Sequence, residues 1–267
     1  LLKDRAGSHP NIVAINEIFF DEPPFYLGMD YVEGRDLRAW WDARGGPKQI
    51  PLATRLEIVA QIADALQSAH NAGILHRDVK PSNILLEGPG FEPGQFSAKL
   101  TDFGVGQVCS QEILTSLTRM GFTQTLLAPN LSTQVGTYLY MSPELFAGKP
   151  ASPQSDIYSL GVVLYQLLVG DLARPLAMDW LVEDPILRDD LRKCFASDPQ
   201  ERFASAGHLA HNLRSHKKRQ ALEAKRTAER KARSNVFLSH LATQRSALIL
   251  FGVIVTLLTA LVVWNLF

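Results

Sequence analysis

Residues 76–83 have the sequence HRDVKPSN, and Asp102 follows nineteen residues after Asn83. Asp78 is a carboxylate that can accept a hydroxyl proton. Lys80, two residues further along an extended loop, points the same way and can neutralise charge on a transferring phosphoryl group. Asn83 and Asp102 offer the hard oxygen ligands that Mg²⁺ prefers. A carboxylate base, a cation and two magnesium ligands are the set required for phosphoryl transfer from ATP to a hydroxyl group.

The segments beside these residues are expected to position them. Residues 84–86 and 98–101 read as the two strands of a short hairpin, joined by a Gly- and Pro-rich loop at 88–94. Asn83 directly precedes the first strand and Asp102 directly follows the second. The sequence therefore predicts that the hairpin delivers both magnesium ligands to one place.

From about Leu1 to about Leu213, the chain resembles the C-terminal lobe of a eukaryotic-type (Hanks-type) serine/threonine protein kinase of the bacterial receptor-like kind. The motifs stand in the family's order: residues 29–34 (MDYVEG) resemble the hinge with Met29 as gatekeeper, residues 102–104 read DFG, and residues 142–144 read SPE where the family has APE. The resemblance implies the α+β kinase fold, here mainly α: the C-terminal lobe with the hinge and the last strands of the N-terminal lobe.

The same resemblance implies ATP and Mg²⁺ as cofactors, and Ser or Thr of a protein as the acceptor. The implied catalytic residues are Asp78, Lys80, Asn83 and Arg77, and the implied metal ligands are Asn83 and Asp102. The implied nucleotide contacts, with Asp36 at the ribose and Leu85 under the adenine, are Asp30, Val32, Asp36, Leu85, Thr101 and Lys80. The implied structural and regulatory residues are His76, Phe103, Gly104, Thr137, Glu144, Asp156 and Arg202.

Some of these roles are pairwise in the family. His76 and Phe103 belong to a packed spine, Asp156 holds the backbone of the segment around Arg77, and Arg202 pairs with Glu144. Lys80 and Thr137 favour Ser/Thr over Tyr as the acceptor. Arg77 resembles the arginine that pairs with a phosphate on the activation segment, and Ser132 and Thr133 are the candidate phosphorylation sites.

The chain also departs from the family pattern. It lacks a glycine-rich phosphate loop, a strand lysine and the partner glutamate, and it opens at Leu1 in what resembles the end of the helix that carries that glutamate. We expect a truncated sequence whose N-terminal lobe lies upstream; a degenerate kinase that lost this lobe is the alternative. The segment from Asp102 to Glu144 is longer than expected for an activation segment, and the segment from Gly170 to Arg202 is compressed.

Charge and hydropathy divide the C-terminal part of the chain. The 267 residues have a net charge of zero, yet residues 214–233 hold nine Lys and Arg against two Glu, a net of +7. Residues 246–267 contain no charged residue over 22 positions, enough for a helix to cross a hydrocarbon core of about 30 Å. We therefore expect a kinase domain at 1–213, a basic juxtamembrane helix or linker at 214–245 and a transmembrane helix at 246–267. The basic flank predicts a single-pass membrane protein with a cytoplasmic catalytic lobe.

Several alternatives remain at this point. Two cysteines are too few for a disulfide framework and favour a reducing compartment.

The apolar segment at 246–267 could be a buried core helix. The basic segment at 214–233 is expected to contact a membrane surface or solvent rather than nucleic acid. A membrane-tethered pseudokinase scaffold is the main rival function, and an aminoglycoside-kinase type of small-molecule phosphotransferase is a second. Expected partners are protein substrates and the membrane, with a homodimer left open.

Overall fold

The computed structural model describes residues 8–19, 26–88, 90, 94–103, 138–170 and 181–264. Gly104, Thr137 and the candidate phosphorylation sites Ser132 and Thr133 lie outside the described residues. The chain divides into two compact units, Leu1–His216 and Lys217–Phe267, which are described separately.

Among the described residues of the first unit there are two small antiparallel sheets. Strand β1 (Ile15–Phe19) pairs with β2 (Tyr26–Met29). The second sheet has the order β3-β4-β5, formed by Gly34–Asp36, Ile84–Glu87 and Ser97–Leu100. The β4–β5 pairing, with Ile84 opposite Leu100, confirms the predicted hairpin.

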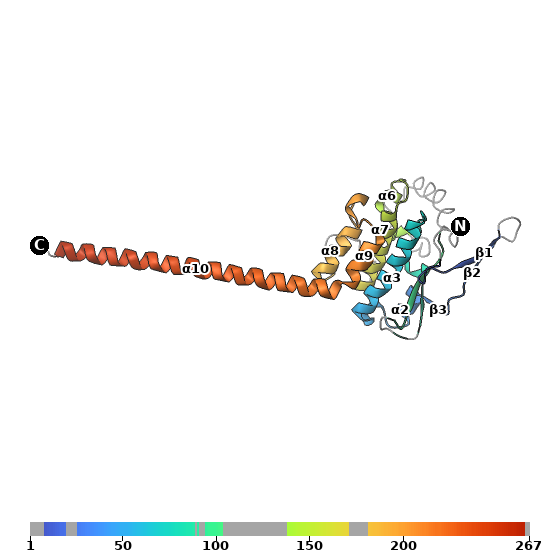
Figure 1. Cartoon of the computed structure of the whole chain (residues 1–267), viewed down its shortest axis with the longest axis horizontal. Coiled ribbons are helices and arrows are strands. Elements are labelled where there is room, and N and C mark those ends of the chain that lie inside the picture. The colour runs from blue at the N-terminus through green and yellow to red at the C-terminus, as the bar shows by residue number, and fades with distance from the viewer. Residues whose placement is uncertain are drawn as a thin grey trace, which may run out of the picture. The chain divides into compact units, whose positions relative to one another are not determined.

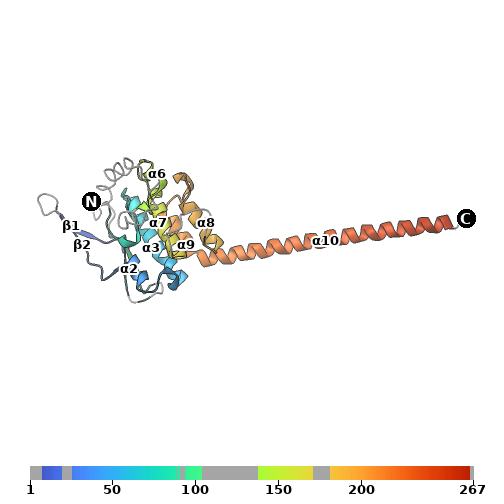
Figure 2. The same cartoon turned by 180° about the vertical axis from the view of Figure 1, so that it is seen from behind.

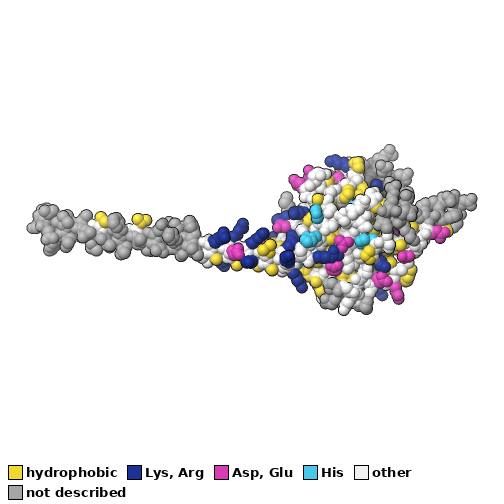
Figure 3. Space-filling model, viewed as in Figure 1, with side chains coloured by type: hydrophobic (Ala, Val, Ile, Leu, Met, Phe, Trp, Pro, Cys, Tyr) yellow, Lys and Arg dark blue, Asp and Glu magenta, His cyan; other side chains and the backbone are white. Residues whose placement is uncertain are grey.

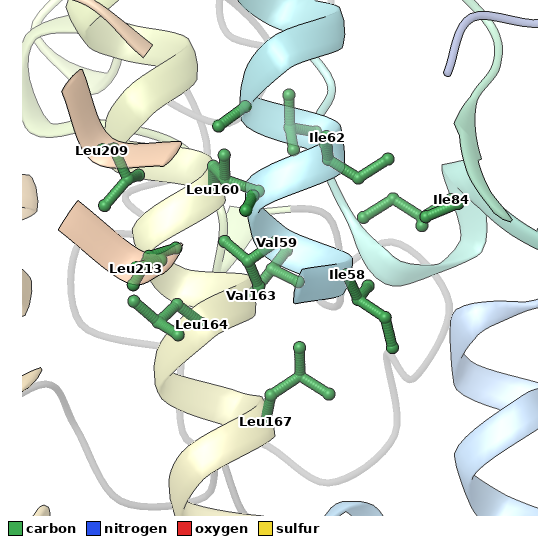
Figure 4. Packing of buried hydrophobic residues seen from close by; sticks show 14 of the residues in the cluster. Ile58, Val59, Ile62, Ile84, Leu160, Val163, Leu164, Leu167, Leu209 and Leu213 are labelled. Carbon is green, nitrogen blue, oxygen red and sulfur yellow. The ribbon is translucent and has the colours of Figure 1, made fainter. Parts of the chain in front are cut away.

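Helices α3 (Leu52–Asn71), α7 (Pro153–Val169) and α9 (Ala206–Arg214) lie side by side in the first unit (Figures 1 and 2). Figure 4 shows the buried aliphatic side chains that fill the space between them; those it labels are Ile58, Val59, Ile62, Ile84, Leu160, Val163, Leu164, Leu167, Leu209 and Leu213. Helix α3 packs one apolar face against the core, and α7 is buried nearly all round. Removal of this apolar surface from water is the main stabilising term of the lobe.

Helix ends follow local sequence signals. Gly73, with φ +74°, takes the left-handed conformation directly after α3 and its C-cap residue Ala72. Helix α7 begins at Pro153, and Ser152 and Ser155 form a capping box. Asp156 therefore lies inside the first turn of α7 and does not cap it. Its carboxylate accepts hydrogen bonds from the backbone N–H groups of His76 and Arg77, as the resemblance implies.

Short helices complete the first unit. They are α2 (Leu37–Asp42), α6 (Pro143–Phe146), α8 (Pro185–Cys194) and the 3₁₀ turns η1 (Pro47–Gln49), η2 (Pro81–Asn83) and η4 (Pro199–Glu201). Trp40 and Trp41 of α2 are buried in the hydrophobic core. The turn η2 leads directly into β4, so the residues at 81–83 are fixed at the end of the sheet.

Helix α10 (His216–Trp264) makes up most of the second unit. One continuous helix contains both the predicted basic helix at 220–233 and most of the predicted apolar helix at 246–267. Its basic side chains gather along residues 217–233, which are exposed (Figure 3). Most side chains of the predicted span lie outside the described residues. Within the described residues, no helix is both long enough and apolar enough to cross a membrane.

Candidate active site

The catalytic-loop residues predicted from sequence converge around one carboxylate. Asp78 Oδ2 lies 2.8 Å from Lys80 Nζ and accepts a 3.1 Å hydrogen bond from Asn83 Nδ2. Asn83 Nδ2 also donates to the backbone carbonyl of Asp78 at 2.9 Å. Asn83 is buried, whereas the side chains of Asp78 and Lys80 are 23% and 22% exposed. The loop thus presents one partly accessible carboxylate and one partly accessible ammonium group at the surface, held from beneath by a buried amide.

His76 links this loop to the end of β5. Its Nε2 lies 2.8 Å from the carbonyl oxygen of Thr101, and its Nδ1 lies 3.2 Å from the backbone N–H of Asp78. The carbonyl must accept and the N–H must donate, so Nε2 carries the proton and the ring is neutral. Burial lowers the pKa of His76, against the opposing effects of Asp156 and Thr101, in agreement with this tautomer. Phe103 packs edge-on against the ring at 4.7 Å between centroids.

Asp156 fixes the backbone immediately before Asp78. Its Oδ1 accepts from the N–H of Arg77 at 2.7 Å and its Oδ2 from the N–H of His76 at 2.9 Å. Arg77 has φ +70°, a left-handed conformation that costs free energy in a non-glycine residue. The two charge-assisted hydrogen bonds offset that cost. The sequence therefore folds into a strained loop here because a carboxylate from α7 holds it.

The two predicted metal ligands lie at the same end of the β4–β5 hairpin. The N–H of Thr101 donates to the carbonyl of Asn83 at 3.0 Å, so Asp102 follows directly on a residue that is paired with Asn83. Asp102 is exposed and has φ +64°. Because both hydrogens of the Asn83 amide point to Asp78, its Oδ1 is turned the other way and accepts a longer 3.4 Å contact from Ser82.

These donors fit a magnesium ion. An amide oxygen and an exposed carboxylate are hard ligands, and Mg²⁺ completes its coordination with water and phosphate oxygens rather than with a full protein cage. In the part of the chain that the structure describes, no cluster of three or more His, Cys, Asp or Glu side chains able to hold a metal occurs.

The predicted nucleotide contacts lie along the hinge and the three-stranded sheet. Asp36 of β3 is directly opposite Leu85 of β4, which brings the predicted ribose and adenine contacts together. Asp36 Oδ1 also accepts from the N–H of Ala39 at 2.9 Å and so caps α2, a second role that sequence reasoning missed. Val32 is buried at 8% exposure, whereas Asp30 is exposed and accepts a 2.7 Å hydrogen bond from Asn16.

Thr101 connects the hinge to the DFG segment. It is 7% exposed, and its hydroxyl lies 3.6 Å from the sulfur of Met29 and 3.5 Å from Asp102 Oδ1. The predicted gatekeeper and the predicted metal ligand are therefore separated by one threonine side chain.

A buried ion pair joins Glu144 of α6 to Arg202 after η4. The contact is bidentate, with Arg202 Nη1 and Nη2 each 2.7 Å from one carboxylate oxygen. Burial by itself raises the pKa of Glu144, but hydrogen bonds from Arg202 and Ser155 lower it to about 2. Arg202 also donates to the carbonyls of Ala196 and Gln154, so the guanidinium is satisfied although fully buried. The structure brings these two residues together across 58 positions.

Sequence reasoning missed one residue of this site. His70, in the last turn of α3, places Nε2 2.8 Å from Asp156 Oδ2, and its side chain is 6% exposed. Its Nδ1 has no hydrogen-bond partner in the structure, and Nε2 donates to the carboxylate of Asp156, which can only accept. The available signal was the position of His70 on the α3 face that carries Leu66 and Ala63, where a polar residue needs a buried partner.

Comparisons with known proteins agree with this geometry. A model of the protein kinase domain matches residues 2–179. The probable serine/threonine-protein kinase PknB of Lactococcus lactis subsp. lactis (strain IL1403) is 36% identical over 167 residues, which cover 62% of this chain and 23% of that protein. The serine/threonine-protein kinase PkaB of Streptomyces coelicolor (strain ATCC BAA-471 / A3(2) / M145) is 37% identical over 164 residues, 61% of this chain and 35% of that protein. The chain thus spans about a quarter to a third of the length of these two relatives.

The fold has solved counterparts as well. The crystal structure of the Mycobacterium tuberculosis PknI kinase domain superposes with a TM-score of 0.56 at 26% sequence identity, covering 77% of this chain and 72% of that domain. The catalytic loop, the β4–β5 hairpin and Glu144 lie within the segment matched by the family model. The chain belongs to the protein kinase family.

Proposed function

We propose that the full-length protein is a serine/threonine kinase that transfers the γ-phosphoryl group of ATP to Ser or Thr residues of proteins. The observation that carries this proposal is the arrangement of Asp78, which lies between Lys80 at 2.8 Å and Asn83 at 3.1 Å. The names of the curated relatives support Ser/Thr specificity. Arg77 and Thr137 are assigned by the resemblance alone.

Each group has a chemical task in this proposal. Asp78 accepts the proton of the substrate hydroxyl. Lys80 neutralises charge on the oxygens of the phosphoryl group during its transfer. Asn83 and Asp102 would hold Mg²⁺, which would neutralise charge on the phosphate oxygens. Val32, Asp36, Leu85 and Thr101 line the nucleotide side, with Asp30 at the hinge. His76 and Asp156 keep the loop in place and touch no reacting atom.

The reaction is tested with purified full-length protein, Mg²⁺, γ-labelled ATP and a generic protein substrate. We expect label on phosphoserine and phosphothreonine, and none on phosphotyrosine. Transfer of label to an aminoglycoside instead of protein identifies a small-molecule phosphotransferase. Absence of any transfer, with ATP binding retained, identifies a pseudokinase scaffold.

We further propose that residues 246–267 anchor the protein in a membrane with the kinase domain in the cytoplasm. The support is in the sequence: 22 residues without charge follow a segment with a net charge of +7. Carbonate should fail to extract the protein from membranes, and deletion of residues 247–267 should release it. Digestion of the lobe by protease added outside sealed cells would contradict the proposed orientation.

Control by phosphorylation is also proposed. Arg77 directly precedes Asp78, so a phosphate paired with Arg77 would order the segment that contains Ser132 and Thr133. In a homodimer, a second copy of the protein would catalyse this transfer from ATP. Mass spectrometry of active protein should detect phosphate at these positions, and fully active protein with an unmodified segment would exclude this mechanism.

A further inference from the structure

Arg214, the last residue of α9, is bound to two carboxylates of α3. Its Nη1 lies 2.7 Å from Asp64 Oδ2, and its Nε donates to Glu57 Oε2 at 3.1 Å. Burial lowers the pKa of Arg214, but the two carboxylates outweigh this effect and raise it. The guanidinium of Arg214 therefore joins the C-terminal end of α9 to one face of α3. Helix α10 begins at His216, two residues further along the chain.

Gln61 continues this contact along α3. It lies one turn after Glu57, and its Nε2 donates to Glu57 Oε1 at 3.4 Å. Its Oε1 accepts from the backbone N–H of Ala98 at 2.8 Å and from Asn11 Nδ2 at 3.1 Å. One amide side chain thus connects a carboxylate held by Arg214 to strand β5.

Strand β5 is held at its outer edge by these groups and by Asn11. Asn11 Nδ2 donates to the carbonyl of Ala98 at 2.8 Å, and its carbonyl accepts from the N–H of Leu100 at 2.8 Å. The carbonyl of Leu100 in turn accepts from the N–H of Val13 at 3.0 Å. Leu100 ends β5, and Asp102 follows two residues later. The edge that leads to Asp102 therefore depends on Asn11 and Gln61, while β4 holds the opposite edge.

We infer that Arg214 regulates the proposed metal ligand Asp102 through the chain Arg214–Glu57–Gln61–β5, so that the end of α9 and the Mg²⁺ site are coupled. This inference rests on the proposed function, since it assigns a control input to the same site. Displacement of Arg214 frees Glu57 to attract the Gln61 amide away from β5, and the outer edge of the strand loosens. Coupling between sites is reciprocal, so binding of Mg²⁺ and nucleotide at Asp102 stabilises the Arg214 contacts in return.

The opposite possibility is that Arg214 makes an ordinary surface ion pair. Such pairs contribute little to stability, and loss of this one would then leave β5 unchanged. The two possibilities differ in where the structure opens. If the Arg214–Glu57–Gln61 contacts are coupled to β5, breaking them loosens β5 alone. A general loss of stability would also affect the central helix α7.

The test measures amide hydrogen exchange in the whole chain carrying Arg214→Gln or Gln61→Glu. Gln61→Glu keeps an oxygen for Ala98 and Asn11 but removes the donor to Glu57, so it interrupts the chain at its middle link. Arg192→Gln is the matched control, because it removes an equal charge from an exposed pair with Asp189 of 3.1 Å on α8. Amide exchange requires no catalysis, so its outcome is independent of whether the protein proves to be a kinase.

We expect Arg214→Gln to speed exchange at Ala98, Leu100 and Val13 on the order of threefold to tenfold, with α7 unchanged. Gln61→Glu should exchange near the wild-type rate, because it keeps the acceptor for Ala98 and Asn11 and lacks the amide that Glu57 attracts. The double variant should match Gln61→Glu, and Arg192→Gln should resemble the wild type. Unchanged exchange in Arg214→Gln would overturn the inference. So would acceleration in the double variant equal to that in Arg214→Gln, or equal acceleration in β5 and α7.

Discussion

The carboxylate of Asp156 accepts a 2.7 Å hydrogen bond from the backbone N–H of Arg77, although 79 positions separate the two residues. Its other oxygen accepts from the N–H of His76 and contacts Nε2 of His70. One buried side chain of α7 thus holds the strained residue next to Asp78. The geometry of the catalytic loop is a property of the helical core as much as of the loop sequence.

Asp156→Asn should destabilise the lobe by about 3 kcal/mol, because an amide presents a donor to partners that are themselves donors and leaves buried groups unpaired. Urea denaturation measures this change in the free energy of unfolding. Asp198→Asn is the control: Asp198 caps η4 at an exposed position, and its loss should cost less than about 1 kcal/mol. Equal losses in the two variants would show that Asp156 has no special structural role.

The Glu144–Arg202 pair predicts an acid-sensitive contribution to stability. The pKa of Glu144 is 4.5 ordinarily and about 2 in the folded protein, so the folded state favours the ionised form. The contribution of the ion pair to the free energy of unfolding is therefore complete above pH 4.5 and is lost as pH falls through 2. The pKa shift corresponds to about 3 kcal/mol. The free energy of unfolding of the wild type and Glu144→Gln, measured between pH 6 and pH 2, should converge toward the acid end. A constant difference over this range would contradict the prediction.

Gly34→Ala should weaken nucleotide binding. A Cβ atom at Gly34 would collide with the backbone carbonyl oxygen of Leu86, which forces β3 away from β4. That displacement separates Asp36 from Leu85 and costs about 1–3 kcal/mol. Calorimetric titration with an ATP analogue should show at least tenfold weaker binding in the full-length protein. Gly207→Ala is the control, since its Cβ would meet the flexible end of the Gln67 side chain; equal affinity in both variants would contradict the argument.

Asp102→Asn should weaken binding of Mg²⁺ and ATP together, because it removes the charged ligand from the metal site. ATP titrations with and without Mg²⁺ separate the two contributions. We expect the enhancement of ATP affinity by Mg²⁺ to fall at least tenfold, with little change in affinity without the metal. An unchanged Mg²⁺ dependence would assign the metal to other residues.

Local motifs predicted much of the site. The hairpin of β4 and β5, the C-terminal end of α3 at Gly73 and the burial of α7 follow from strand, cap and apolar patterns over a few residues. The proximity of Asn83 and Asp102 also follows, because a hairpin joins them. These features depend on short-range sequence.

The remaining features depend on tertiary contacts between distant residues. His70, Gln61 and Arg214 look like ordinary helix-face residues, and their significance arises from partners that are 86, 37 and 157 positions away. The sequence left residues 214–245 open as a helix or a linker, and in the structure residues 216–245 belong to the continuous helix α10.

The most direct test of the central claim compares ATP binding and phosphoryl transfer in full-length protein carrying Asp78→Asn. The substitution keeps the size of the side chain and removes the proton acceptor, so we predict near wild-type binding of Mg²⁺ and ATP with transfer to a protein substrate slowed by about 10² to 10⁴. Asp42→Asn, which breaks an exposed contact with Arg38, should leave both quantities unchanged. Transfer by Asp78→Asn at a rate near that of the wild type would contradict the account.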